Sequence, residues 1–231
     1  GLWLRQGNTE GQPVIRAARA NRDGTELFGV SFMTFNSDGQ PVSRIESREA
    51  LLSPGYWTLK GVKEWRLDAT NPETLKGLCE GADIAITTMG LTGASTKVTS
   101  YDIDHKGNMN FYAECVRAGV KKFNYISVIS CDQPGAEEVP MLHAKYLVEQ
   151  EIKAQPMDWV IYRPTGYFYD IAKVFKPYID KGEMQLLKGY GGVKANVVDC
   201  PDFAQFIVDH MNDTNVTYNV GGKETYTYIE M

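Results

Sequence analysis

The sequence has no long hydrophobic run: no window approaches the roughly 18 uninterrupted apolar residues that a membrane-spanning helix needs. It also lacks an excess of basic residues, because 24 Lys and Arg stand against 29 Asp and Glu, for a net charge of −5. Nucleic acid and anionic membranes both favour a basic partner, so we expect neither. The N-terminal stretch has no apolar core segment, so we expect no signal peptide there, while a removed organelle-targeting segment stays open.

Cysteine is scarce. The four cysteines, Cys79, Cys115, Cys131 and Cys200, are widely separated, with no C-x-x-C pair and no histidine at metal-ligand spacing. Disulfide frameworks and structural zinc sites need paired spacings that are missing here. We therefore expect reduced thiols, no metal site, and a reducing compartment, either the cytoplasm or an organelle interior.

What is present is typical of a globular protein, with 43% hydrophobic and 23% charged residues. The length of 231 residues predicts one substantial core and a single domain over residues 1–231. Short β-branched and aromatic runs alternate with longer amphipathic stretches. The runs are Leu27–Met33, Glu64–Leu67, Ile84–Thr88, Phe123–Val128, Trp159–Arg163 and Thr217–Val220, with a short first strand at Leu2–Arg5. The helix-like stretches are Pro13–Ala20, Pro72–Glu80, Gly107–Ala118, Leu142–Ala154, Ile171–Lys181 and Pro201–Met211.

This alternation predicts an α/β fold, a doubly wound, Rossmann-type parallel sheet with helices on both faces. Parallel strands need crossovers of about a dozen residues, and the helix-like stretches supply them. Residues 35–60 do not follow the scheme, because they hold two polar, turn-rich patches without clear periodicity. We expect a long irregular surface excursion there, between the second and third strands.

From about Gly61 onward the sequence resembles an atypical short-chain dehydrogenase/reductase, specifically the NmrA-like and NAD-dependent epimerase-like branch. The segments that carry the resemblance occur in the family's order and at about its spacings. They are Leu67–Thr70, Gly81–Gly90, Ala118–Val128, His143–Lys145, Tyr162–Phe168 and Tyr218–Gly222.

The resemblance implies a nucleotide site at the carboxyl ends of the strands, where open parallel sheets bind ligands. Asp68 would lie beside the adenine, Thr88 and Gly90 would end the fourth strand, and Ser127 would end the fifth. The turn Pro164-Thr165-Gly166 would contact the nicotinamide carboxamide, so the implied cofactor is NAD or NADP. Ordinary turn chemistry at strand ends is the alternative for all of these positions.

The glycine fingerprint departs from the family pattern. Gly7 and Gly11 are the candidate phosphate-binding glycines, but with Gly11 as the last glycine the two earlier positions hold Asn8 and Arg5. Glu10 adds a negative charge where a phosphate would lie. The second strand ends with neither an acid nor an arginine for the ribose, so the preference between NAD and NADP cannot be predicted.

Catalysis in the wider family uses a Tyr-x-x-x-Lys pair with a nearby serine. Lys145 and Ser127 match the lysine and the serine, so both are candidate catalytic residues, and Lys145 would also hold the nicotinamide ribose. Met141 occupies the tyrosine position, and methionine cannot transfer a proton. The alternatives are an i,i+4 pair between Lys145 and Glu149, and a Ser127 hydroxyl that only satisfies local backbone. Asp104 is interpreted as a helix N-cap.

Two hypotheses of different class follow. The first is an NAD(P)-dependent oxidoreductase or epimerase-like enzyme that acts on a small carbonyl, alcohol or sugar. The second is a non-catalytic dinucleotide sensor, or an accessory subunit of a larger complex, that keeps the fold but lacks the tyrosine. The partner is a small-molecule substrate in the first case and a protein in the second. The sequence after Gly221-Gly222 is short, so we expect a reduced C-terminal substrate region.

Overall fold

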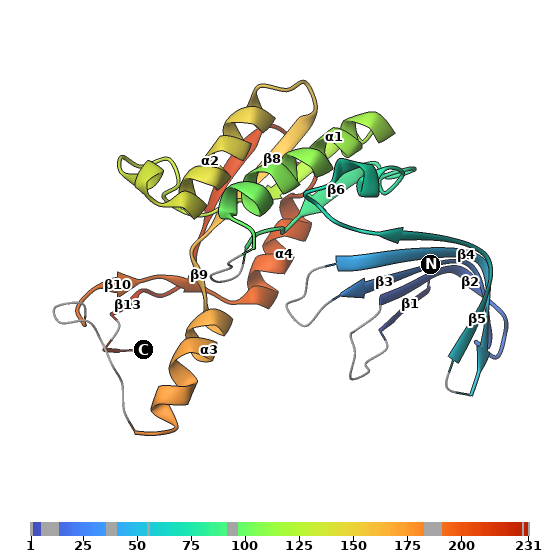
Figure 1. Ribbon diagram of the computed structural model, residues 1–231. Helices are drawn as coiled ribbons and strands as arrows, with labels where there is room; N and C mark the ends of the chain where they lie inside the picture. The colour runs from blue at the N-terminus through green and yellow to red at the C-terminus, as the bar shows by residue number, and fades with distance from the viewer. Residues whose placement is uncertain are drawn as a thin grey trace. The chain divides into compact units, whose positions relative to one another are not determined.

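The computed structural model describes residues 2–5, 14–35, 41–54, 56–91, 97–182, 191–227 and 229–230. The chain forms two compact units (Figure 1). The first takes in Gly1–Leu78, and the second takes in Cys79–Leu91 and Thr96–Met231. This differs from the expected single domain. No helix among the described residues is long and apolar enough to cross a membrane.

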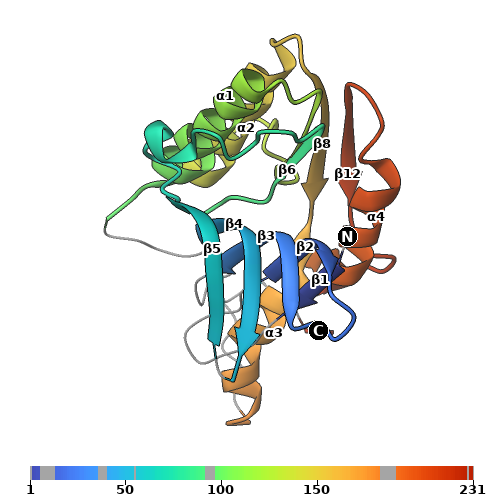
Figure 2. The ribbon, with the colours of Figure 1, turned by 90° about the vertical axis from the view of Figure 1, so that its right-hand side faces the viewer.

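The first unit is a five-stranded antiparallel sheet in the order β1-β2-β3-β4-β5 (Figure 2). Its strands are β1 Leu2–Arg5, β2 Val14–Ala20, β3 Glu26–Phe35, β4 Pro41–Ser53 and β5 Tyr56–Arg66. A short 3₁₀ helix, η1 (Pro72–Leu75), follows. Apolar side chains gather on one face because successive residues of a strand point to opposite faces. They are Ile15, Ala17, Leu27, Val30, Phe32 and Ala50, with Ile45, Trp57 and Leu59 packed against them.

Several predictions for this region were wrong. The runs Leu2–Arg5 and Glu64–Leu67, expected in the parallel sheet, form β1 and the end of the antiparallel strand β5. The helix expected over Pro72–Glu80 is reduced to η1. The stretch from Val14 to Ala20 forms a strand rather than a helix, because its pairing with β3 overrides the helix propensity of its alanines. The run Leu27–Met33 lies in the antiparallel strand β3 rather than in a parallel sheet. The expected irregular excursion over residues 35–60 is occupied, where the structure describes it, by the paired strands β4 and β5. Ser53 at the end of β4 pairs with Tyr56 at the start of β5, so one of the two turn-rich patches separates the strands of a hairpin.

The second unit contains a four-stranded parallel sheet in the order β12-β8-β7-β6. The strands are β6 Ile84–Thr87, β7 Lys122–Ile126, β8 Asp158–Pro164 and β12 Val216–Val220. The π-helix η2 (Tyr101–Gly107) runs into α1 (Asn108–Ala118), and α2 (Pro140–Lys153) follows β7. Helix α4 (Cys200–His210) leads to β12. The prediction of a Rossmann-type parallel sheet with helices on both faces is thereby confirmed for this unit.

The two faces of the parallel sheet carry different helices. Tyr112 of α1 packs edge-on against Phe123 of β7 on one face, and α2 lies beside α1 on the same side (Figure 1). On the other face, Phe203 and Ile207 of α4 join a core with Val160 and Tyr162 of β8. Burial of apolar surface on both faces is what a parallel sheet requires.

Smaller elements follow the carboxyl end of β8. Strand β9 (Gly166–Tyr167) pairs with β11 (Val197–Val198), and β10 (Lys194–Ala195) pairs with β13 (Tyr226–Thr227). Helix α3 (Phe168–Ile179) follows β9, and the short 3₁₀ helix η3 (Ala136–Glu138) precedes α2. All of these elements belong to the second unit.

Candidate functional site: the strand ends of the parallel sheet

Most of the site residues predicted from the sequence lie along one edge of the second unit. Thr87 of β6 is in register with Tyr125 of β7, and Ile126 is in register with Tyr162 of β8. Because the strands are parallel, their carboxyl ends meet at the same edge. Thr88, Gly90, Ser127 and the Pro164–Gly166 turn follow those ends directly.

Lys145 of α2 reaches this edge and forms an ion pair with a buried carboxylate. Its Nζ lies 3.3 Å from Oδ1 of Asp104, whose side chain is 1% exposed against 12% for the lysine. The ammonium also donates to the backbone carbonyl of Ile126 at 3.4 Å. It lies 5.6 Å from the centre of the Tyr125 ring, within range of a cation–π interaction. The alternative pairing of Lys145 with Glu149 is wrong, because Glu149 bonds elsewhere.

Gly90 lies directly against this ion pair. A Cβ at this position would come within 2.9 Å of Asp104 Oδ1 and 3.3 Å of Lys145 Nζ. The other carboxylate oxygen of Asp104 accepts a hydrogen bond from the backbone N–H of Leu91 at 3.2 Å. Asp104 is therefore no N-cap: it lies inside the π-helix η2 and ties the loop after β6 to α2.

Burial governs the titration of the lysine. Removal from water lowers the pKa of Lys145, because desolvation disfavours the ammonium form and outweighs the opposing attraction of Asp104. A lysine of this kind holds its proton less firmly than one at the surface.

Ser127 takes part in a second buried network. Its hydroxyl donates to Oε1 of Glu149 at 2.6 Å, and its residue is 3% exposed. Arg163 of β8 binds both oxygens of the same carboxylate, with Nε at 2.8 Å and Nη2 at 2.7 Å. Lys153 reaches Oε2 at 3.0 Å, and the Cys131 thiol reaches Oε1 at 3.2 Å.

This network keeps Glu149 ionised. Burial alone acts to raise the pKa of Glu149, but the hydrogen bonds from Arg163, Ser127, Lys153 and Cys131 lower it overall. The fork of the Arg163 guanidinium matches a carboxylate with two parallel bonds, which is the strongest geometry for such a pair. The hydroxyl proton of Ser127 is thus committed to a neighbouring carboxylate.

The turn after β8 carries an unpartnered polar atom. Oγ1 of Thr165 is buried and has no hydrogen-bond partner among the described residues, although its backbone N–H bonds to the Val220 carbonyl at 2.9 Å. Buried hydroxyls are normally satisfied, so this atom fits a ligand polar group such as a carboxamide. Gly221 lies close by, and a Cβ there would meet the Thr165 methyl at 3.4 Å.

Three predicted residues do not belong to the described part of the second unit. Asp68 belongs to the first unit, where its Oδ1 accepts hydrogen bonds from the N–H of Thr70 at 2.9 Å and its hydroxyl at 2.7 Å. Gly7 and Gly11 lie outside the described residues. The strands on either side of them, β1 and β2, pair antiparallel, whereas the fingerprint joins a parallel strand to a helix.

The fit to a dinucleotide is therefore partial. Lys145 and Thr165 fit the nicotinamide end, with a cation for the ribose and an unpaired hydroxyl for the carboxamide. For the phosphates, the parallel sheet has no strand beyond β6 among the described residues, and the Rossmann order places the phosphate-binding strand at that edge.

The comparison with protein families finds a match that takes in most of the second unit and the end of the first. The NAD(P)H-binding family model matches residues 56–214, more than half of the chain. The chain belongs to the NAD(P)H-binding family. The resemblance to atypical short-chain dehydrogenases of the NmrA-like and epimerase-like branch is confirmed as well.

Individual relatives are distant. The photosystem II assembly factor Ycf39 of Synechocystis sp. is 24% identical over 178 residues, which cover 74% of this chain and 53% of that protein. UDP-glucose 4-epimerase of Thermus thermophilus, solved in complex with NAD, superposes with a TM-score of 0.58 at 19% identity, covering 72% of this chain and 65% of that one. Triphenylmethane reductase of Citrobacter sp., solved with NADP(H), gives 0.55 at 16% identity, covering 71% and 55%. The chain spans about half the length of the curated relative it matches.

Proposed function

We propose that this protein binds NAD or NADP by its nicotinamide end at the strand ends of the second unit, and that it does so without turnover, in an accessory role. The observation that carries the proposal is the state of the would-be catalytic groups. The Ser127 hydroxyl donates its hydrogen bond to Glu149, and Met141 stands in the tyrosine position.

Binding would use two side chains of this edge. Lys145, presented by α2, would hydrogen-bond the nicotinamide ribose, and the Thr165 hydroxyl would meet the carboxamide. When bound, the nicotinamide supplies or accepts a hydride. The preference between NAD and NADP stays open, because no described residue at this edge marks a ribose 2′-phosphate.

Proton transfer is the missing step. A carbonyl reduction needs a group that donates a proton as the hydride arrives. The methionine cannot do so, and the buried Tyr125 has its pKa raised well above the ordinary value of 10.0, chiefly by burial. That neither of these side chains can supply the proton supports binding without turnover.

Two observations favour an accessory role. The curated relative at 24% identity is an assembly factor. Helix α3 also has no buried side chain among those described, and it exposes Phe168, Tyr169 and Ile179. Exposed apolar groups that gather on one element are typical of protein-interaction surfaces.

The second candidate function is an oxidoreductase or epimerase-like enzyme for a small carbonyl, alcohol or sugar. One feature favours it: Lys145 has a lowered pKa and lies at the strand ends, so it is the available side chain for moving a proton there. In that case the reaction rate would follow the titration of this lysine.

Titration with NADH and with NADPH, followed by nicotinamide fluorescence, tests the proposal. Replacing the ion pair by Asp104→Asn together with Lys145→Met removes the cation without stranding a buried carboxylate. We expect at least a tenfold loss of affinity in this double variant. The control is Lys121→Ala, which removes an exposed lysine far from the strand ends. If the double variant bound the cofactor as tightly as the unaltered protein, Lys145 would not be part of the site.

A test of turnover separates the two candidate functions. The protein, saturated with NADPH or NADH, is mixed with quinones, aldehydes and nucleotide sugars, and loss of the nicotinamide absorbance is recorded. Binding without oxidation of the cofactor supports the accessory role. Steady oxidation that the double variant abolishes would establish the enzyme instead.

A further inference from the structure

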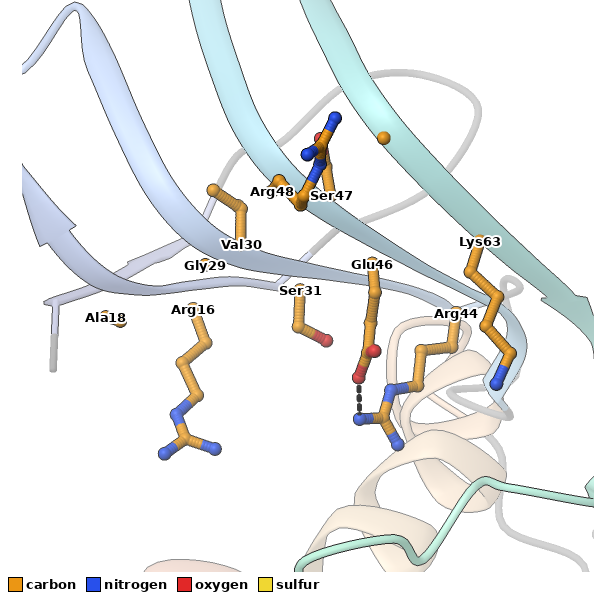
Figure 3. A pocket seen from close by; sticks show the side chains of 11 residues that line it. Arg16, Ala18, Gly29, Val30, Ser31, Arg44, Glu46, Ser47, Arg48 and Lys63 are labelled. Carbon is orange, nitrogen blue, oxygen red and sulfur yellow. Dashed lines mark hydrogen bonds and ion pairs between the residues drawn. The ribbon is translucent and has the colours of Figure 1, made fainter.

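The antiparallel sheet of the first unit carries a hollow of about 590 Å³ on one face (Figure 3). This volume falls within the range of about 300–1,000 Å³ that is usual for small-molecule sites. The hollow is lined by Arg16, Ala18, Gly29, Val30, Ser31, Arg44, Glu46, Ser47, Arg48, Gly61 and Lys63, which come from β2, β3, β4 and β5. All of them belong to the first unit, whereas the strand ends of the parallel sheet belong to the second.

The floor of the hollow is a cross-strand row in which three small residues, Ala18, Gly29 and Gly61, are joined by Arg48. In the register of β2 and β3, Ala18 lies opposite Gly29. In the registers of β4 with β3 and with β5, Arg48 lies opposite Gly29 on one side and Gly61 on the other. Both glycines have left-handed φ values, +59° and +66°, which other residues rarely adopt. A Cβ on Gly29 would come within 3.1 Å of the Ala18 Cβ, and one on Gly61 would collide with the Arg48 side chain.

Glycine weakens the interior of a strand, because it adds conformational entropy to the unfolded chain and no side chain to the sheet. Two such glycines in one row therefore lower the stability of the sheet, so folding alone does not account for them. Glycines within strands often mark a place where a ligand approaches the backbone closely, and here they face the hollow.

A second row beside the floor is polar and has a cation at each end. The register aligns Arg16, Ser31, Glu46 and Lys63 across four strands. The carboxylate of Glu46 forms an ion pair with Arg44 (Figure 3). The lining as a whole therefore holds three arginines and a lysine against one carboxylate, in a protein whose net charge is −5.

We propose that this hollow binds a small molecule that carries two or more phosphate groups. Guanidinium groups bind phosphate oxygens in bidentate fashion, and a lysine adds a point charge. Neighbouring strands lie about 4.8 Å apart, so Arg16 on β2 and Lys63 on β5 are separated by three spacings, or about 14 Å. Cations spread across the width of four strands suit several linked phosphates better than a single one.

The shape of the surface favours a small ligand over nucleic acid. A nucleic acid needs an extended basic stripe, whereas the four cations here line one hollow. The cations here surround a hollow with a floor of alanine and glycine, which suits a compact polyanion.

Calorimetric titration of the full chain with inorganic triphosphate tests the proposal. We expect one saturable site that persists at physiological salt. Arg16→Gln and Lys63→Gln should each weaken binding at least fivefold, and the double variant at least twentyfold. Arg22→Gln, in the exposed turn between β2 and β3, is the matched control and should change the affinity less than twofold. All three positions are exposed in the native sheet or its turn, so folding is retained.

Ala18→Leu tests whether the shape of the hollow, and not only its charge, contributes to binding. It fills the floor of the hollow without altering any charge, so binding should fall at least fivefold if the hollow itself is the site. Equal weakening by Arg22→Gln, no effect of Ala18→Leu, or several weak sites that vanish at physiological salt would overturn the proposal. Tighter binding of a single-stranded oligonucleotide than of triphosphate would also overturn it, because the surface would then be a nucleic-acid surface.

Discussion

At the scale of residues, Glu149 is the central side chain of the second unit. It is fully buried and ionised, and it joins α2 to β8 through the Arg163 fork and to the end of β7 through Ser127. Breaking one side of a buried ion pair strands the other charge in a medium that solvates it poorly. The position of α2, and with it the position of Lys145, depends on this carboxylate.

We expect Glu149→Gln to lower the free energy of unfolding by about 3 kcal/mol, because the amide keeps the shape but leaves the buried Arg163 with only its salt bridge to Asp132. Urea unfolding followed by circular dichroism measures the effect. Lys121→Ala, which removes an exposed ion pair with Asp83, serves as the control and should leave the curve unchanged. A Glu149→Gln curve that overlays the unaltered protein would show that the network contributes nothing to stability.

The same carboxylate gives a pH dependence of defined sign. The pKa of Glu149 in the folded protein lies below its ordinary value of 4.5, so as the pH falls the unfolded chain takes up the proton first. The stability contributed by Glu149 is therefore complete above pH 4.5 and is lost as the pH falls through the lower pKa of the folded state. Unfolding free energies measured from pH 7 to pH 3 should fall less steeply for Glu149→Gln than for the unaltered protein. Parallel profiles would contradict this assignment.

The sequence identified some of these residues and could not identify others. Ser127 and Lys145 were found because they match a family pattern at strand ends. The partner of Lys145 could not be found, because Asp104 is distant in the sequence and belongs to a helix whose π geometry has no periodic signature. The role of Glu149 was missed for a related reason. Its spacing in the sequence suggested an ion pair with Lys145, but its partners Arg163 and Ser127 lie on β8 and at the end of β7.

At the scale of elements, the sequence predicted the second unit well and the first unit poorly. Strands β6, β7, β8 and β12 are short apolar runs separated by amphipathic helices. Such alternation is typical of a parallel sheet covered by helices. The seven residues of β2 contain three alanines and two arginines, which suit a helix, and only pairing with β3 makes them a strand. Strand propensity depends on neighbours that a sequence alone does not identify.

Helices α2 and α3 should differ sharply in hydrogen exchange. Helix α2 buries Ala144, Val148 and Ile152, whereas α3 has no buried side chain among those described and contains Pro177, which lacks a backbone N–H. We expect peptides from Phe168–Ile179 to exchange at least a hundredfold faster than peptides from Pro140–Lys153, by mass spectrometry. Equal protection would show that another surface covers α3 in solution.

At the scale of the whole molecule, the chain consists of an antiparallel sheet unit and a parallel sheet unit with separate cores. Each core lies within its own unit, so a change in one need not unfold the other. Glu149→Gln should therefore speed exchange in β7 and β8 and leave β2, β3 and β4 unchanged. Faster exchange in both sheets would show that the two units unfold as one.

The central claim is that the nicotinamide end of NAD or NADP lies at the strand ends of β6, β7 and β8. The most direct measurement is hydrogen exchange by mass spectrometry with and without saturating NADH or NADPH. We predict that the cofactor slows exchange in peptides covering Thr88–Leu91 and Arg163–Tyr167, and that the Asp104→Asn/Lys145→Met variant loses this protection. Protection confined to residues 14–66, or none at cofactor concentrations in the millimolar range, would contradict the account.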